Sequence, residues 1–163
     1  MLKNKIDYDF IEIGTSNFHA LIMDCSDETI GLSIEPLQVY LNTLPNKPNV
    51  TKVSAAISDQ DGEIEIYNIP LSSIQKHNLP IWVKGTNSVS KPHEYARKKL
   101  GEELYDSIVS IDKVPTMSWK TLISKYSIKS VDYLKIDTEG HDHVILKSYL
   151  KNVIRILNYT QIK

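Results

Sequence analysis

The chain has 163 residues, a formal charge of −1 and a single cysteine, Cys25. This length suits one domain over residues 1–163, and the near-neutral charge gives no electrostatic case for binding nucleic acid. No apolar stretch approaches the roughly 20 residues that cross a bilayer, and a lone cysteine excludes an internal disulfide framework. We therefore expect a cytoplasmic protein without a nucleic-acid partner or a membrane span.

The first half of the chain alternates predicted strands with predicted helices. Apolar and β-branched runs, bounded by turn residues, indicate the strands. Apolar side chains at helical spacing predict helices over residues 17–24 and 37–44, and Pro36 suits the first position of the second helix. The strands are expected over residues 8–13, 29–35, 50–58 and 63–67, the last being half-exposed and antiparallel.

Residues 69–113 interrupt this alternation. Gly85, Pro92 and their polar neighbours predict a loop over residues 79–93, whereas apolar side chains four apart predict a helix over residues 93–111. Insertions of this length in a compact domain are usually functional or disordered. We expect this one to be a cap that shapes a substrate pocket.

The last part of the chain returns to the alternating pattern, with helices expected over residues 118–128 and 141–150 around a strand at 131–137. Strands that alternate with helices predict an α/β fold, here a Rossmann-like, doubly wound and mostly parallel sheet. Residues 156–163 begin one more strand in which the sequence stops. We therefore expect the C-terminal hairpin of the fold to be truncated.

Acidic side chains follow each of the predicted parallel strands. In a doubly wound sheet, ligands bind beyond the carboxyl ends of the strands. Carboxylates that share such a rim repel each other, so a cation, a metal ion or ligand hydroxyls must offset them. The residues at these strand ends are Glu12 with Gly14, then Glu35, then Ser58 with Asp59, and finally Asp137 with Glu139.

The spacing of two of these residues indicates a nucleoside. Glu35 follows Gly14 by 35 − 14 = 21 residues, close to the roughly 20 that separate a glycine turn from a ribose-binding acid. A carboxylate at this place can accept hydrogen bonds from both ribose hydroxyls. The remaining candidates for the ligand are a dinucleotide and S-adenosylmethionine.

The segment DFIEIGTSNF, residues 9–18, favours S-adenosylmethionine. A pyrophosphate needs glycines at the helix start and is repelled by nearby negative charge. Here Glu12 precedes Gly14, and Phe18 stands where a second glycine would be needed. S-adenosylmethionine carries a cationic sulfonium and ammonium, which an acidic rim attracts. A glycine is needed at position 14 because the methionine part of the cofactor is expected to pass close to the backbone there.

Several segments resemble the FkbM-type methyltransferases, a branch of the class I S-adenosylmethionine-dependent enzymes. They are FIEIGTSNF, GLSIEP, AAISDQDGEIEIY, VPTMSWKTLI and VDYLKIDTEGHDHVIL, spread over about residues 8–163. The KIDTEGHD segment, with its spacing after VPTMSWKTL, is the most specific of them. The resemblance implies a Rossmann-like sheet and methyl transfer to an oxygen of a small-molecule or glycan acceptor, typically a sugar, a lipid or a secondary metabolite.

The resemblance also implies roles for individual residues. By this similarity, Glu12, Gly14, Thr15 and Ser16 would border the methionine part of the cofactor, Glu35 would bind the ribose hydroxyls, Ser58 and Asp59 would lie beside the adenine, and Asp137 would lie under the sulfonium and face the acceptor.

Candidates for the general base lie in the turn after the last strand. An alcohol acceptor has a proton to lose, so a base assists the transfer. We expect Asp137 to position the cofactor and either His141 or Glu139 to act as the base, since the unperturbed pKa of histidine is near neutrality. His141 and His143 are two residues apart and diverge on a helix, so we expect no metal ion.

Two other functions fit parts of the pattern. An NAD-dependent oxidoreductase would share the sheet and the ribose-binding acid, although the missing glycines argue against it. A non-catalytic Rossmann-like binding module would keep the fold without turnover, and Phe18 together with the abrupt end of the sequence favours this alternative. The sequence specifies neither the methyl acceptor nor the oligomeric state.

Overall fold

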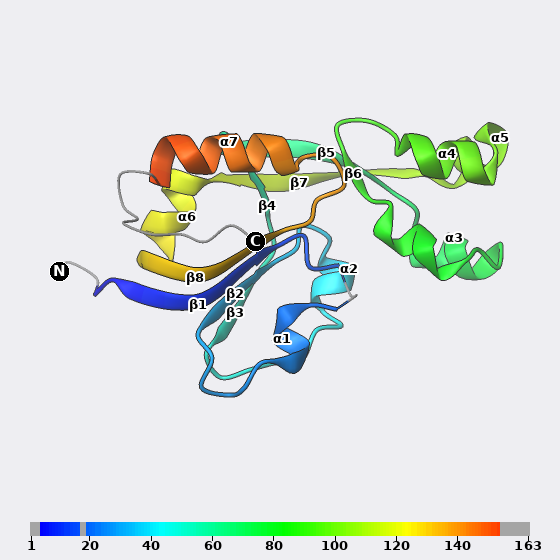
Figure 1. The fold of residues 1–163 in the computed structure, drawn as a ribbon. Helices are drawn as coiled ribbons and strands as arrows, with labels where there is room; N and C mark the ends of the chain where they lie inside the picture. The colour runs from blue at the N-terminus through cyan, green and yellow to red at the C-terminus, as the bar shows by residue number, and fades with distance from the viewer. Residues whose placement is uncertain (1–3, 17–18, 154–163) are drawn as a thin grey trace.

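The computed structural model describes residues 4–16 and 19–153, which form two four-stranded sheets where a single sheet was predicted (Figure 1). The first sheet has the order β3-β2-β1-β8, and all of its strand pairs are parallel. The α/β class and the parallel sheet are therefore confirmed. The strands are β1 (Ile6–Ile13), β2 (Gly31–Ile34), β3 (Val50–Val53) and β8 (Ile128–Ile136).

The second sheet is mixed and has the order β4-β7-β5-β6. Strands β4 and β7 are parallel, whereas β5 pairs antiparallel with both β6 and β7. The antiparallel strand expected over residues 63–67 is confirmed as part of β5. The strands are β4 (Ala56–Ser58), β5 (Gly62–Asn68), β6 (Ser88–Val89) and β7 (Ser110–Ser118).

Two strand predictions were wrong. The single strand expected over residues 50–58 is divided, because the chain leaves the first sheet after Val53 and enters the second at Ala56. Val50 and Val53 of β3 and all three residues of β4 are buried, so the apolar pattern does not mark the change of sheet. Strand β7 was missed because most of its side chains are not buried and Pro115 interrupts the β-branched pattern.

Helices α1 (Leu21–Asp24) and α2 (Gln38–Leu41) cover one face of the first sheet. Ile22 and Leu41 pack there against Phe10 of β1. Pro36 does not begin α2 as predicted. Leu37 stays extended, with φ −87° and ψ 105°, because its N–H is held by the Glu35 carboxylate at 2.9 Å.

Helices α6 (Trp119–Lys125) and α7 (Asp142–Val153) cover the opposite face, as predicted. The indole Nε1 of Trp119 donates to the carbonyl of Ile145 at 3.1 Å, and its ring meets that of Tyr149 edge-on. These side chains pack with Ile11 and Ile13 of β1 in the largest buried cluster. The helices therefore fix the end of β1 from which the candidate site is built.

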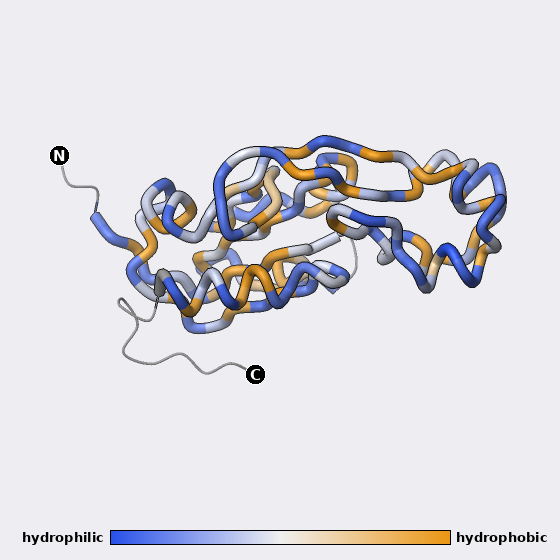
Figure 2. The backbone as a smooth tube through the Cα atoms, turned by 90° about the horizontal axis from the view of Figure 1, so that it is seen from above, coloured by the Kyte–Doolittle hydropathy of each residue, from blue (hydrophilic) through white to orange (hydrophobic). Residues whose placement is uncertain are grey.

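Residues 69–109 extend away from the two sheets except at β6, which pairs with β5 (Figure 2). They contain α3 (Leu71–Lys76), the 3₁₀ helix η1 (Ile81–Gly85), β6, α4 (Glu94–Leu100) and α5 (Glu102–Ile108). The helix expected over residues 93–111 is divided at Gly101, which has φ +87°. This segment has its own buried cluster, formed by Ile69, Ile74, Val83, Ala96, Tyr105 and Ile108.

Two expectations fall on residues outside the described part of the chain, namely Phe18 and the strand from residue 156. Within the described part, no helix combines the length and the hydrophobicity that a membrane crossing requires.

Candidate functional site

A cavity lies where the carboxyl ends of β1, β2 and β8 approach the beginning of β4. Its walls come from both sheets and from residues 85–89 of the 69–109 segment. Parallel strands present their carboxyl ends on one edge, which explains why residues far apart in sequence meet here. The predicted site residues that line the cavity are Gly14, Thr15, Ser16, Glu35, Asp137, Glu139 and His141.

Gly14 is required by the neighbouring strand. It has φ +81°, and a Cβ added there would lie 1.9 Å from the carbonyl oxygen of Asp137. The Asp137 N–H in turn donates to Ile13 at 2.9 Å. From the sequence, a glycine was expected here because a cofactor would pass close to the backbone. The positive φ and the Asp137 carbonyl already account for it, because a side chain would collide with the backbone.

Glu35 is fixed at the edge of the cavity by two backbone donors. The Ser16 N–H donates to Oε2 at 2.7 Å, and the Leu37 N–H donates to Oε1 at 2.9 Å. Burial raises the pKa of Glu35, and these two hydrogen bonds oppose the rise. An ionised carboxylate offers about four lone pairs. Glu35 can therefore accept further hydrogen bonds from a ligand without losing its orientation.

Glu12 has a different environment from the one predicted. It is fully buried and is not among the residues that line the cavity. Its Oε1 accepts from the Lys135 Nζ and its Oε2 from the Leu21 N–H, both at 2.8 Å. Burial raises the pKa of Glu12, whereas these partners oppose the rise. Glu12 therefore joins β8 and α1 instead of bordering the cavity.

Lys135 was missed in the sequence. It lies opposite Glu12 in the parallel register of β1 and β8, so its cation offsets the charge of this buried carboxylate. In the sequence, Lys135 stands two residues before Asp137, the acid at the end of this strand. Its role becomes clear only when β8 is known to pair with β1.

The turn between β8 and α7 is held by Asp142. Its Oδ1 accepts from the N–H of Thr138 at 2.8 Å and from the hydroxyl at 2.9 Å. Burial alone would raise the pKa of Asp142, but hydrogen bonds such as those from Thr138 lower it overall. Positive φ angles at Glu139 (+49°) and Gly140 (+104°) complete the tight turn. Asp137, Glu139 and His141 are thereby brought to one wall of the cavity.

His141 is oriented by Ser58. The Ser58 hydroxyl donates to Asp59 Oδ1 at 3.2 Å and lies 3.1 Å from His141 Nε2. A hydroxyl has one hydrogen, so Ser58 accepts from Nε2–H and leaves the lone pair of the imidazole on Nδ1. Burial lowers the pKa of His141, and the charge of His143 acts in the same direction. The imidazole is therefore neutral at pH 7.

The places of Ser58 and Asp59 differ from the predicted contact with adenine. Ser58 is buried beside His141, and Asp59 is exposed. Neither is among the lining residues, which on this side are Ala55, Ala56 and Ile57. The predicted acidic rim is therefore formed by Glu35, Asp137 and Glu139, without Glu12 and Asp59.

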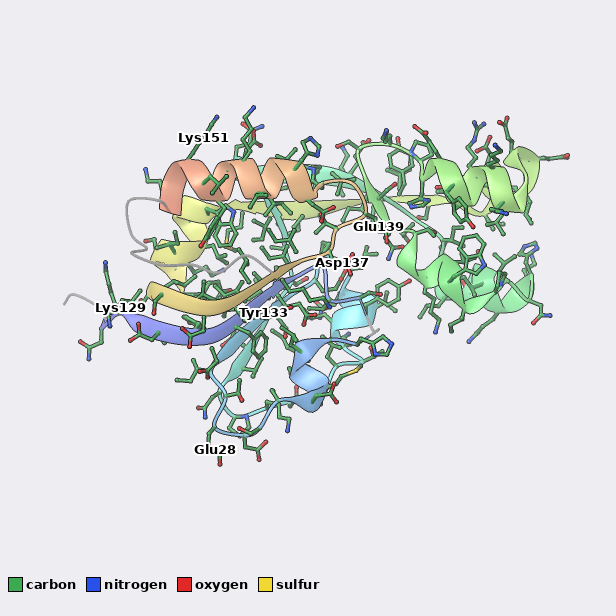
Figure 3. The ribbon with its side chains drawn as sticks, viewed as in Figure 1. Glu28, Lys129, Tyr133, Asp137, Glu139 and Lys151 are labelled. Carbon is green, nitrogen blue, oxygen red and sulfur yellow. The ribbon has the colours of Figure 1, made fainter. Side chains whose placement is uncertain are left out.

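Glu139 contacts a residue that the sequence argument missed, His93 at the start of α4. The Glu139 Oε2 lies 3.2 Å from His93 Nε2. The His93 Nδ1 accepts from the Ala96 N–H at 3.2 Å, so neutral His93 carries its proton on Nε2 and donates it to Glu139. Figure 3 shows Asp137 and Glu139 on the loop after β8, on the side nearest the 69–109 segment.

Two buried polar atoms on residues that line the cavity have no hydrogen-bond partner within the described part of the chain. They are Ser16 Oγ and Asn87 Oδ1. Buried polar atoms are normally hydrogen-bonded, so both are available to a ligand. The described residues contain no group of three metal-ligating side chains.

Comparison with known proteins gives one family. The family model for the methyltransferase FkbM domain matches residues 8–162, while no curated protein and no solved structure matched. This family uses S-adenosylmethionine and implies a Rossmann-like fold, in agreement with the parallel sheet and its glycine turn. Because the match covers nearly the whole sequence, the chain belongs to the methyltransferase FkbM domain family.

Proposed function

We propose that this protein transfers a methyl group from S-adenosylmethionine to a hydroxyl oxygen on a small-molecule or glycan acceptor, such as a sugar, a lipid or a secondary metabolite. The observation that carries this proposal is the presence of Glu35, Asp137 and His141 in the walls of one cavity. The cavity thus combines a carboxylate that can bind ribose hydroxyls, a second acid at the end of a strand, and a neutral imidazole.

The cavity residues fit this cofactor. Glu35 keeps lone pairs free for the ribose hydroxyls, and Ser16 Oγ is a buried polar atom with no partner among the described residues. Asp137 carries negative charge that favours a cationic ligand. When bound, S-adenosylmethionine supplies an electrophilic methyl group on its sulfonium.

His141 is the better candidate for the general base. Its neutral imidazole carries a lone pair on Nδ1, held in orientation by Ser58. Glu139 already accepts a hydrogen bond from His93, so one of its carboxylate oxygens is engaged. His141 then takes the hydroxyl proton of the acceptor, while Asp137 positions the reacting groups. Alignment of this kind supplies much of the rate in a direct displacement.

The 69–109 segment forms the outer wall of the site. Gly85, Asn87 and Val89 line the cavity, and His93 contacts the loop that bears Asp137 and Glu139. We assign the acceptor side of the pocket to the part of this segment around His93, so that the segment acts as the cap expected from the sequence. The hydroxyl acceptor would approach from this side, opposite the ribose-binding edge.

Two measurements test the proposal. Isothermal titration should show binding of S-adenosylhomocysteine and no binding of NAD, and the reverse result would favour an oxidoreductase. Transfer of labelled methyl from S-adenosylmethionine should then be measured with a panel of sugar, lipid and aromatic hydroxyl acceptors. Binding of the cofactor with no transfer to any of them would favour the non-catalytic module.

A further inference from the structure

Asn87 presents an unusual amide to the cavity. Its Nδ2 donates to the carbonyl of Lys84 at 3.1 Å, and its Oδ1 is buried with no partner among the described residues. The bond to Lys84 distinguishes Nδ2 from Oδ1, because a flipped amide would place Oδ1 against the carbonyl oxygen of Lys84. A free acceptor oxygen is therefore held in a defined orientation.

The surroundings of Asn87 place it on the Glu35 side of the cavity. Burial raises the pKa of Tyr40 in α2, and a hydrogen bond from the Asn87 side chain opposes the rise. Leu37, two residues after Glu35, lines the same cavity. An apolar cluster completes this region, formed by Leu37, Tyr40, Ala56, Ile66 and Val114 with Val89 packed against it.

We propose that Asn87 recognises the adenine of the cofactor, so that the 69–109 segment determines which base is accepted. This inference rests on the function proposed above. A base is joined directly to its ribose, so a nucleoside held at Glu35 places its base in the adjoining part of the cavity. Leu37, Ala56 and Val89 supply apolar surfaces there for the faces of a planar ring.

The amide matches the edge of adenine. Asparagine pairs with adenine by accepting from the exocyclic amine and donating to a ring nitrogen. Asn87 Oδ1 is free for the first bond, whereas Lys84 and Tyr40 engage the two hydrogens of Nδ2, so the contact with adenine uses the acceptor alone. Hypoxanthine has an oxygen in place of the amine, which would oppose Oδ1. The site should therefore prefer adenosine over inosine derivatives.

The test compares S-adenosylhomocysteine with S-inosylhomocysteine, the analogue that differs in this edge of the base. The wild-type protein should bind the adenosine compound about tenfold to a hundredfold more tightly, the range expected when a buried acceptor loses its single donor. Asn87→Ala should weaken the binding of S-adenosylhomocysteine and so bring the two affinities close together. Asn46→Ala, an exposed asparagine after α2, is the matched control and should keep the wild-type ratio.

Thermal unfolding should first show that each variant is folded, and Asn87→Asp provides a second variant of nearly the same size. Equal binding of both compounds by the wild-type protein would overturn the inference, as would an unchanged ratio in a folded Asn87 variant. Absence of any S-adenosylhomocysteine binding by the wild-type protein would instead refute the proposed function on which the inference rests.

Discussion

Glu12 and Glu35 stand at the ends of adjacent parallel strands, and burial raises the pKa of both. Their partners differ. Glu12 is neutralised by Lys135 from β8, whereas both hydrogen bonds to Glu35 come from backbone N–H groups, and Glu35 borders the cavity. An acid at a strand end is thus structural where the next strand supplies a cation, and available to a ligand where only the backbone holds it.

The largest expected effect lies on the structural side of this comparison, where β1 meets β8. Gly14→Ala should lower the free energy of unfolding by more than about 3 kcal/mol, because the new methyl group would meet the Asp137 carbonyl at a positive φ. Gly101→Ala is the control. Gly101 has φ +87° and ψ 138° with no atom within 4 Å of the added Cβ, so only the backbone strain of about 1–3 kcal/mol remains.

Urea unfolding of both variants separates the collision from the strain. Equal losses of stability in Gly14→Ala and Gly101→Ala would show that the contact between the two strand ends is not close.

Removal of the cation beside Glu12 should have the next largest effect. Lys135→Met leaves a buried carboxylate without its ion pair and should cost about 3 kcal/mol of unfolding free energy, since Lys135 is itself partly exposed. The double variant Glu12→Gln/Lys135→Met should recover most of this loss. Binding of S-adenosylhomocysteine should change little in the folded variants, and a large loss of affinity would give Glu12 a role in the ligand site.

The ligand side is tested by Glu35→Gln. The amide can accept through one oxygen only, so S-adenosylhomocysteine should bind about tenfold to a hundredfold more weakly by calorimetry. Glu28→Gln is the control, because Glu28 is exposed and lies away from the Asp137 loop (Figure 3). Wild-type affinity in Glu35→Gln would remove this residue from the cofactor site.

The smallest effect concerns the pH dependence set by His141. Burial lowers the pKa of His141, so the folded protein disfavours the protonated imidazole. The stability that its neutral form contributes is present above the unfolded pKa, about 6.5, and is lost as the pH falls through the lower folded pKa. Urea unfolding between pH 7 and pH 5 should show a shallower loss of stability in His141→Gln. Methyl transfer by the wild-type protein should likewise persist below pH 6.5.

The sequence predicted the parallel sheet and most of the polar side chains that line the cavity because their signals are local. A strand followed by Gly14, or by an acid such as Glu35 or Asp137, is recognisable within a few residues. The division at Ser54 and the strand β7 were not recognisable. Both depend on which sheet a segment joins, and neither changes the local pattern of apolar residues enough to be read.

The residues that complete the site were hidden for the same reason. Lys135, His93 and Asn87 owe their roles to partners or cavity walls that only the fold brings near. The role of Ser58 was also obscured, since its contact with His141 joins β4 to the start of α7. Polar residues of these types are common on protein surfaces, and only their contacts in the folded chain distinguish the functional ones.

The division of the chain between Val53 and Ala56 has a consequence for any occupant of the cavity. Glu35 follows a strand of the first sheet, while Ala56 and Ile66 belong to the second. A bound nucleoside would therefore act as a cross-link between the two sheets. At a concentration 100 times its Kd it would add about 2.7 kcal/mol to the free energy of unfolding, and amide exchange should slow in both sheets together.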